Sequence, residues 1–340
     1  MKLDRSSKGL VICLATAGLA LGLAGMAFLR RKRNRTEPRL PDDPPGGEAG
    51  TGEASQPQPA NPGSDLPFPA KQPNHSSPEK LPLDYFALVF ALAVPFWLFG
   101  KQKLPLPMEL PASALGFANP TIAASILTYR RKGWDGVKAL FKRAFRTPKP
   151  KIWYLPAIFL LPAIYTLSYG IMRWTGMQLP TPNVPILMAP VFFVLFFIPA
   201  LGEEVGWMGY AVEPLQNRWG ALKAALILGV AWALWHVIPD IQNQKPASWI
   251  IWHRLYTIAL RILIVSLYNN SGKSVLAAIL LHTMDNVTVF LFPNYGSHYN
   301  PMVTGSLAWL AAGIVLLKWG PKTLARDRIA TQTPSWGIRS

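Results

Sequence analysis

The sequence predicts an all-α membrane protein, a polytopic bundle of about eight core transmembrane helices preceded by one N-terminal transmembrane helix. Half of the 340 residues are hydrophobic and 15% are charged. The apolar residues are gathered into long blocks instead of being spread at the spacing typical of a soluble core. Each block is near the ~20 residues that a helix needs to cross a bilayer.

The charge distribution indicates a lipid partner and excludes nucleic acid. Lys and Arg outnumber Asp and Glu by 34 to 17, and the surplus lies between and beside the apolar blocks. Such loop charges face anionic headgroups in membrane proteins. The single cysteine, Cys13, lies inside the first apolar block, which excludes a disulfide scaffold and a Cys-based zinc site. We therefore expect a multi-pass protein of the cell membrane.

The chain divides into four regions. Residues 1–35 are expected to form a transmembrane anchor, because RRKRNR follows the apolar stretch; a cleaved signal peptide is the alternative, which this basic cluster argues against. Residues 36–80 are rich in Pro, Gly, Ser and acidic residues, which predicts a disordered linker. Residues 81–320 form the membrane core, and residues 321–340 form a basic tail.

The apolar blocks of the core define its expected spans. Prolines inside them can be accommodated by neighbouring helices. The basic segment YRRKGWDGVKALFKRAFRTPKPK between two blocks is expected to lie along the headgroups as an amphipathic helix. This segment, the other basic loops and the C-terminus are predicted to be cytoplasmic. The expected spans are about 81–99, 110–129, 152–172, 183–201, 221–238, 249–268, 274–292 and 302–318.

Two adjacent carboxylates, Glu203 and Glu204, end one of the most apolar runs. A charge near the bilayer centre costs about 3 kcal/mol even on lenient scales, so a functional role is expected. Adjacent side chains on a helix point about 100° apart, so the two carboxylates should have separate roles. Position 208 lies on the face of Glu204.

Two further spans carry histidines. Trp232 and His236 are four residues apart in one span, and His282 and Asn286 have the same spacing in another, with Asp285 turned away. Each has a structural alternative, since His and Asn also form hydrogen bonds between membrane helices and a Glu near a helix end can face the interface. The occurrence of all of them in one chain favours a functional site.

These side chains can support hydrolysis of an amide in two ways. A carboxylate beside a His can act as a general base toward water, and a second His with an amide can donate to the developing oxyanion. Alternatively, Glu203, His236 and His282 could ligate a divalent metal such as Zn²⁺ that activates water. The cofactor therefore stays undecided between none and a metal. No HExxH motif is present, which excludes a standard zincin arrangement.

The segments EEVGWMGY, WALWH and LYNNSGKSVLAAILLHTMDN resemble the three motifs EExxxR, [FW]xxxH and HxxxN of the CAAX-protease and bacteriocin-processing family of intramembrane endopeptidases, the type II CAAX prenyl proteases among them. The resemblance covers about residues 81–320 and excludes the N-terminal helix and linker. It implies that Glu203 and His236 activate water, that His282 and Asn286 form an oxyanion hole, and that Glu204 and Trp232 support them. Members are described as glutamic proteases or as metalloproteases. Their substrates include prenylated CAAX proteins, bacteriocin precursors and membrane-anchored regulators.

One position departs from the family pattern. Met208 stands where the family has an Arg that would neutralise Glu204. Glu204 must then be protonated, reach interfacial water, or pair with another cation such as Arg218 or Arg261. A protease is the first hypothesis. A degraded member that acts as a membrane scaffold or bacteriocin self-immunity factor is the second. An ion- or proton-coupled transporter ranks lowest, because no second half resembles the region from Glu203 to Asn286.

Overall fold

The computed structural model describes residues 81–100, 102, 112–181, 186–292, 296 and 298–326. The predicted anchor, the linker and residues 327–340 of the tail lie outside these residues. Every regular element in the described part is helical, which confirms the predicted fold class. The long helices are α2 (Leu83–Phe99), α3 (Asn119–Ala144), α4 (Tyr154–Trp174), α5 (Ala189–Gly206), α7 (Ala221–Gln242), α8 (Ala247–Asn270), α9 (Val275–Leu291) and α10 (Pro301–Thr323), and a short helix α6 (Val212–Trp219) follows α5.

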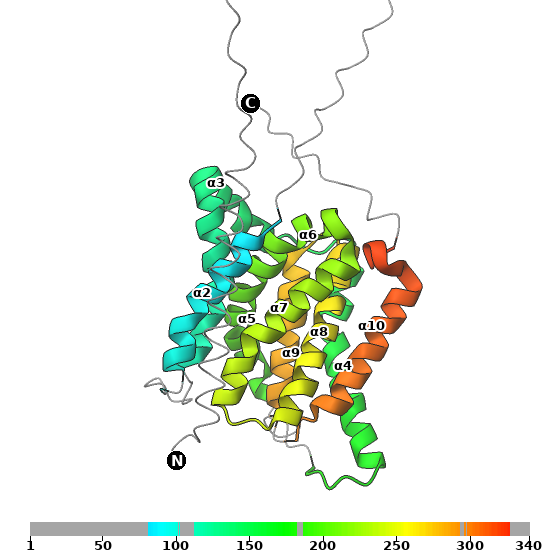
Figure 1. Ribbon diagram of the computed structural model, residues 1–340. Coiled ribbons are helices and arrows are strands. Elements are labelled where there is room, and N and C mark those ends of the chain that lie inside the picture. The colour runs from blue at the N-terminus through cyan, green and yellow to red at the C-terminus, as the bar shows by residue number, and fades with distance from the viewer. Residues whose placement is uncertain are drawn as a thin grey trace, which may run out of the picture.

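The long helices stand side by side, with α2 and α3 at one edge of the bundle and α10 at the other (Figure 1). Helix α8 lies inside, packed between α7 and α10, while α9 packs on α4 and α5. Every residue from Ala259 to Asn270 of α8 is buried. A polar side chain in this half of α8 can therefore be satisfied only by another helix.

Five of the described segments are long and apolar enough to cross a membrane, and α2 and α9 are shorter apolar helices of 17 residues. The eight expected blocks correspond to α2, α3, α4, α5, α7, α8, α9 and α10, but the block at 110–129 has a different form. Residues Ala112–Ala118 are a 3₁₀-helix, and α3 begins at Asn119. The segment expected to be a separate amphipathic helix continues α3 beyond a kink at Gly133, where φ is 62°.

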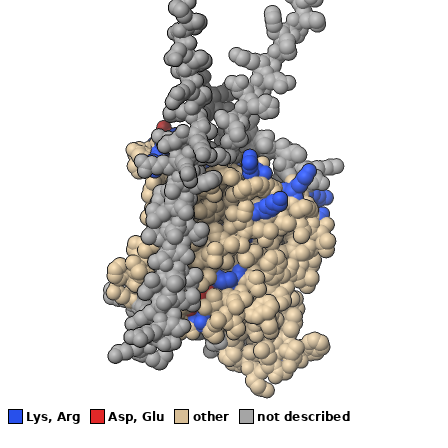
Figure 2. All heavy atoms as spheres, viewed as in Figure 1, with Lys and Arg blue, Asp and Glu red and all other residues tan. Residues whose placement is uncertain are grey.

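The surface of the bundle is consistent with a membrane-integral protein. Large apolar side chains are exposed around it, including Leu187 and Leu317 at 89% each. On the face in Figure 2 the surface is mostly uncharged, and most of the Lys and Arg atoms gather toward the upper end, near α6 in Figure 1. The amphipathic half of α3 buries Val137 and Leu140 and exposes Trp134.

The LYNNSGKS motif, which forms the end of α8 and the connection to α9, ties several segments together. Asn270 Nδ2 donates to the Leu324 carbonyl at 3.0 Å, and the Arg326 amide donates to Asn270 Oδ1 at 3.1 Å. Ser274 Oγ donates to the Arg146 carbonyl at 2.5 Å and also caps α9 by accepting from the Ala277 amide. The motif therefore holds the end of α10 and the end of α3 against the bundle.

The end of α5 is fixed by a close backbone approach. A Cβ on Gly206 would lie 2.4 Å from the Pro120 carbonyl oxygen and 2.5 Å from the Tyr85 hydroxyl, so no larger residue fits without a shift. A π-helical segment, Trp207–Ala211, follows directly. Such segments are frequent at functional sites. This contact with α3 sets the height and rotation of the preceding glutamates in the bundle.

Candidate active site

Glu203 lies near the end of α5 and is 6% exposed. Its Oε2 accepts a hydrogen bond from Trp232 Nε1 of α7 at 2.6 Å. A charge-assisted bond of this length fixes the carboxylate group in one orientation. The Glu203 side chain also lines a cavity of about 530 Å³ inside the bundle.

Trp232 lies at the centre of the predicted residues. Its ring meets those of His282 and His236 edge to face, with centroids 5.0 and 5.7 Å apart. The Arg261 guanidinium lies over the same indole, 4.2 Å from the centroid. A cation above an aromatic face is attracted by the ring quadrupole, so Trp232 contacts both the histidines and a buried cation.

Glu204 takes a different set of partners, as the 100° step between adjacent side chains predicts. Its Oε2 accepts from Arg261 Nη1 at 2.6 Å, and its Oε1 is 2.9 Å from His282 Nδ1. The Glu204 and Arg261 side chains are fully buried. The sequence left three ways to balance the charge of Glu204: protonation, contact with interfacial water, or a cation other than residue 208. The structure shows the third, with Arg261 as the cation. Met208 is fully buried and apolar.

His236 is half-buried and is held by its own helix. Its Nδ1 lies 3.0 Å from the Trp232 carbonyl oxygen. Because a carbonyl only accepts, Nδ1 carries the proton and Nε2 is left with a lone pair. The ring also contacts Trp235, with centroids 4.6 Å apart. His236 therefore has the tautomer that a general base requires.

The cavity brings together three of the four predicted catalytic residues. Glu203, His236 and Asn286 line it. His282 is not among the lining residues and lies against Glu204 and Trp232 instead. The rest of the lining is mostly apolar, with Ala93, Phe96, Trp97, Leu195, Phe196, Ile198, Pro199 and Phe290 among its residues.

The predicted metal ligands do not form a metal site. Within the described residues, no group of three or more His, Cys, Asp or Glu side chains is placed to hold a metal ion. One oxygen of Glu203 faces the Trp232 N–H, and His282 Nδ1 faces Glu204. Zinc sites need three or four converging ligands, so this donor set does not fit the metal alternative.

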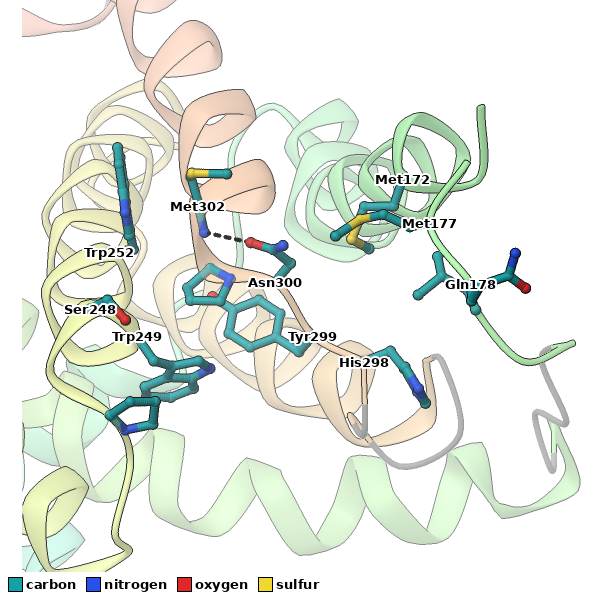
Figure 3. Close-up of a pocket in the computed structure, with 13 residues that line it drawn as sticks. Met172, Met177, Gln178, Ser248, Trp249, Trp252, His298, Tyr299, Asn300 and Met302 are labelled. Atoms are coloured by element: carbon teal, nitrogen blue, oxygen red, sulfur yellow. Dashed lines mark hydrogen bonds between the residues drawn. The ribbon is translucent and has the colours of Figure 1, made fainter. Parts of the chain in front are cut away.

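A second cavity, of about 600 Å³, lies near the beginnings of α8 and α10 (Figure 3). The residues that line it include Trp249, Trp252, Tyr299 and Met302, together with residues at the end of α4. None of the predicted site residues lines this cavity.

Asp285 accepts hydrogen bonds from Tyr165, at 3.0 Å, and from Tyr256, so it belongs to a separate buried cluster of hydroxyls. Asp285 is thus turned away from the candidate site, as expected.

Asn119 and Trp235, which also line the first cavity, are not among the sequence-predicted residues. Asn119 is the first residue of α3, whereas Glu203 lies near the end of α5. No local sequence pattern relates two positions so far apart. Trp235 is adjacent to His236, but its position on the helix by itself suggests only packing. Their place at the cavity follows from the tertiary arrangement.

The comparisons with known proteins agree with the motifs. The family model described as "Type II CAAX prenyl endopeptidase Rce1-like" matches residues 185–288. The matched range contains Glu203, His236, His282 and Asn286. CAAX prenyl protease 2 of Methanococcus maripaludis is 26% identical over 260 residues, and the alignment covers 68% of this chain and 92% of that protein. Both findings support an endopeptidase that acts within a membrane. In its motifs and in both comparisons, this chain is similar to the CAAX protease family.

Proposed function

We propose that this chain is an intramembrane endopeptidase that hydrolyses a peptide bond of membrane-associated protein or peptide substrates with water activated by Glu203 and His236. The observation that carries the proposal is the cavity in the bundle that the Glu203 carboxylate, the His236 imidazole and the Asn286 amide share. A buried acid and a neutral His at one cavity are the groups that general base catalysis needs.

In the proposed reaction, water enters the cavity and loses a proton to Glu203 or to His236 Nε2 as its oxygen attacks the substrate carbonyl carbon. The C–N bond then breaks, and the same proton passes to the leaving amine nitrogen. Trp232 supports this step because its Nε1 donates a 2.6 Å hydrogen bond to Glu203 Oε2, which fixes the orientation of the carboxylate at the cavity.

The charge that develops on the carbonyl oxygen is assigned to Asn286, and the family resemblance implies His282, which lies outside the cavity lining, as the second donor. Asn286 lines the cavity and can donate from its amide. His282 donates Nδ1–H to Glu204, so a second N–H for the oxyanion requires the imidazolium form. An ionised Glu204, balanced by Arg261, favours that form. Glu204 is therefore a positioning residue that acts through His282.

The substrate class is proposed from the lining and the relative. The apolar residues of the cavity suit an apolar peptide segment or an attached lipid chain. The relative from Methanococcus maripaludis is named a CAAX prenyl protease. We expect the basic end of the bundle to face the cytoplasm of a cell membrane. Reporter peptides with and without a prenyl group, and one based on a bacteriocin precursor, distinguish the candidate substrates.

The test follows cleavage of these reporters by the purified chain in detergent and in vesicles. Glu203→Gln and His236→Ala should each lower the rate at least about 100-fold, since a general base contributes about 10²–10⁴-fold. Glu213→Gln is the matched control, because it makes the same charge change at a half-buried glutamate in α6. A chelator should leave the activity unchanged.

Two results would contradict the proposal. A wild-type protein that binds the reporters and cuts none of them would favour the scaffold or immunity hypothesis. Proton-dependent flux across the vesicle membrane without cleavage would favour the transporter. Cleavage that a chelator abolishes and Zn²⁺ restores would instead overturn the metal-independent mechanism alone.

A further inference from the structure

Two buried hydrogen-bond donors at the cavity have no partner in the described part of the chain. They are Nδ2 of Asn119, which is 1% exposed, and Nε1 of Trp235, which is 6% exposed. Buried polar groups in folded proteins almost always form hydrogen bonds, so an unpaired donor in a cavity indicates a group that binds there.

Both side chains line the same cavity as Glu203 and His236. Asn119 is the first residue of α3 and follows the 3₁₀-helix, part of which lines the cavity as well. Trp235 precedes His236 on α7, and their rings are in contact. Other unpaired donors, such as Trp207 Nε1, belong to residues that do not line it. The two unpaired donors therefore belong to residues that border the space where a substrate would bind.

The chemistry of the lining defines what they would bind. Two donors need acceptor oxygens, and no Lys or Arg is found among the lining residues that the structure describes. A carboxylate would bring an unbalanced charge into this apolar space, whereas a carbonyl oxygen would not. A peptide within a membrane also needs donors for its carbonyl groups, because lipid provides none.

We propose that Asn119 and Trp235 form a subsite that binds backbone carbonyl oxygens of the peptide substrate beside the reacting bond. The inference rests on the proposed function, because the peptide is the substrate of that reaction. The two residues bind carbonyls that do not react, so their bonds are equally strong in the ground state and the transition state. Such contacts affect KM and leave kcat largely unchanged.

The principal test is Trp235→Phe, which removes the indole N–H and keeps an aromatic ring. KM for a cleaved reporter should rise about fivefold to tenfold, with kcat within about twofold, as expected for one hydrogen bond. Asn119→Leu, of similar size and without a donor, should act in the same direction. Trp174→Phe is the control, because Trp174 is 88% exposed at the end of α4.

A second measurement separates binding from packing. Reporters in which one peptide bond is replaced by an ester have a weaker acceptor at that carbonyl. At the position bound by the subsite, the ester should raise KM for the wild type and have no further effect in Trp235→Phe. Equal ester effects in both proteins at every position would overturn the proposal, as would an unchanged KM in both donor variants.

Failure of the proposed function is distinguished by equilibrium binding of a fluorescent reporter peptide to Glu203→Gln, with and without Trp235→Phe. If the wild type cleaves nothing, the endopeptidase assignment fails. In that case a fivefold or larger rise in Kd on Trp235→Phe still supports a peptide-binding subsite. The absence of binding, or a Kd that Trp235→Phe does not change, overturns it.

Discussion

The pairing of Glu204 with Arg261 can be tested by replacing the arginine with an apolar residue of similar length, Arg261→Met. In the structure the two charged groups are 2.6 Å apart at their closest atoms, and both side chains are fully buried. The variant keeps Glu204 but removes its contact with Arg261. Of the two side chains that contact the Glu204 oxygens in the structure, only His282 remains. The perturbation therefore creates a buried carboxylate that has lost its permanent cation.

The expected cost is large. Unit charges about 4 Å apart attract by about 4 kcal/mol at an effective dielectric constant near 20. Removing one partner of a buried ion pair typically destabilises a protein by about 3–5 kcal/mol. The contact of Arg261 with the Trp232 ring is lost as well. We expect Arg261→Met to lower the free energy of unfolding by about 3–5 kcal/mol.

The assay is denaturant-induced unfolding of the purified protein in detergent, followed by tryptophan fluorescence. Lys273→Met is the matched control, because Lys273 forms a 2.6 Å ion pair with Glu213 in which the two side chains are 23% and 21% exposed. Partly exposed pairs contribute little, so the control should lose about 1 kcal/mol or less. Removing the charge of Glu204 as well, in Glu204→Gln/Arg261→Met, should recover at least about half of the loss.

The same reasoning predicts the effect of restoring the family arginine. Met208 is fully buried, and Arg261 already balances Glu204. Met208→Arg alone should therefore destabilise the protein, whereas in the Arg261→Met background it should restore part of the stability. If Arg261→Met unfolds at the wild-type denaturant concentration, or if Glu204→Gln makes its loss larger, the paired arrangement is wrong.

Three further predictions concern Trp232, Gly206 and Asn270. Trp232→Phe removes the 2.6 Å bond to Glu203 and should lower kcat/KM of reporter cleavage about 10-fold or more, and an unchanged kcat/KM would argue against orientation by the indole. Gly206→Ala should destabilise the protein by about 1–3 kcal/mol, because its Cβ would lie 2.4 Å from the Pro120 carbonyl oxygen. The comparison is Gly313→Ala in α10, where an added Cβ would have no neighbouring atom within 4 Å. The Tm of this control should be unchanged or slightly higher than that of the wild type. Asn270→Ala removes the bonds that hold Leu324 and Arg326, so limited proteolysis should cut the C-terminal segment faster than in the wild type, and equal rates would contradict this anchoring role.

Most of the fold was predictable because hydropathy is a local property. The apolar blocks at 221–238 and 249–268 coincide with α7 and α8, since a long apolar segment in a membrane must satisfy its own backbone as a helix. The block at 110–129 was placed wrongly, as its first part is a 3₁₀-helix and α3 starts at Asn119. The sequence does carry a helix-start signal there, because Pro120 stands in the first turn of α3, where proline is favoured.

The sequence was enough to name the candidate site residues, but it did not show which side chains each of them contacts. Spacing placed Trp232 with His236 and His282 with Asn286, and the angle between adjacent side chains separated Glu203 from Glu204. The motifs predicted that Glu203, His236 and Asn286 belong to one site, and the structure adds that the three line one cavity. The position of His282 behind Trp232, and the unpaired donors of Asn119 and Trp235, required the packed bundle.

The sequence by itself thus determined the helical membrane class, the identity of the candidate residues and the need of Glu204 for a counter-charge. The tertiary structure decided which cation meets that need. Arg218 and Arg261 were equal candidates in the sequence, and the structure places Arg261, 57 positions beyond Glu204, in the interior half of α8. The physical reason is that helix formation depends on neighbours along the chain, whereas the pairing of buried charges depends on which helices pack together. That packing is a property of the whole bundle.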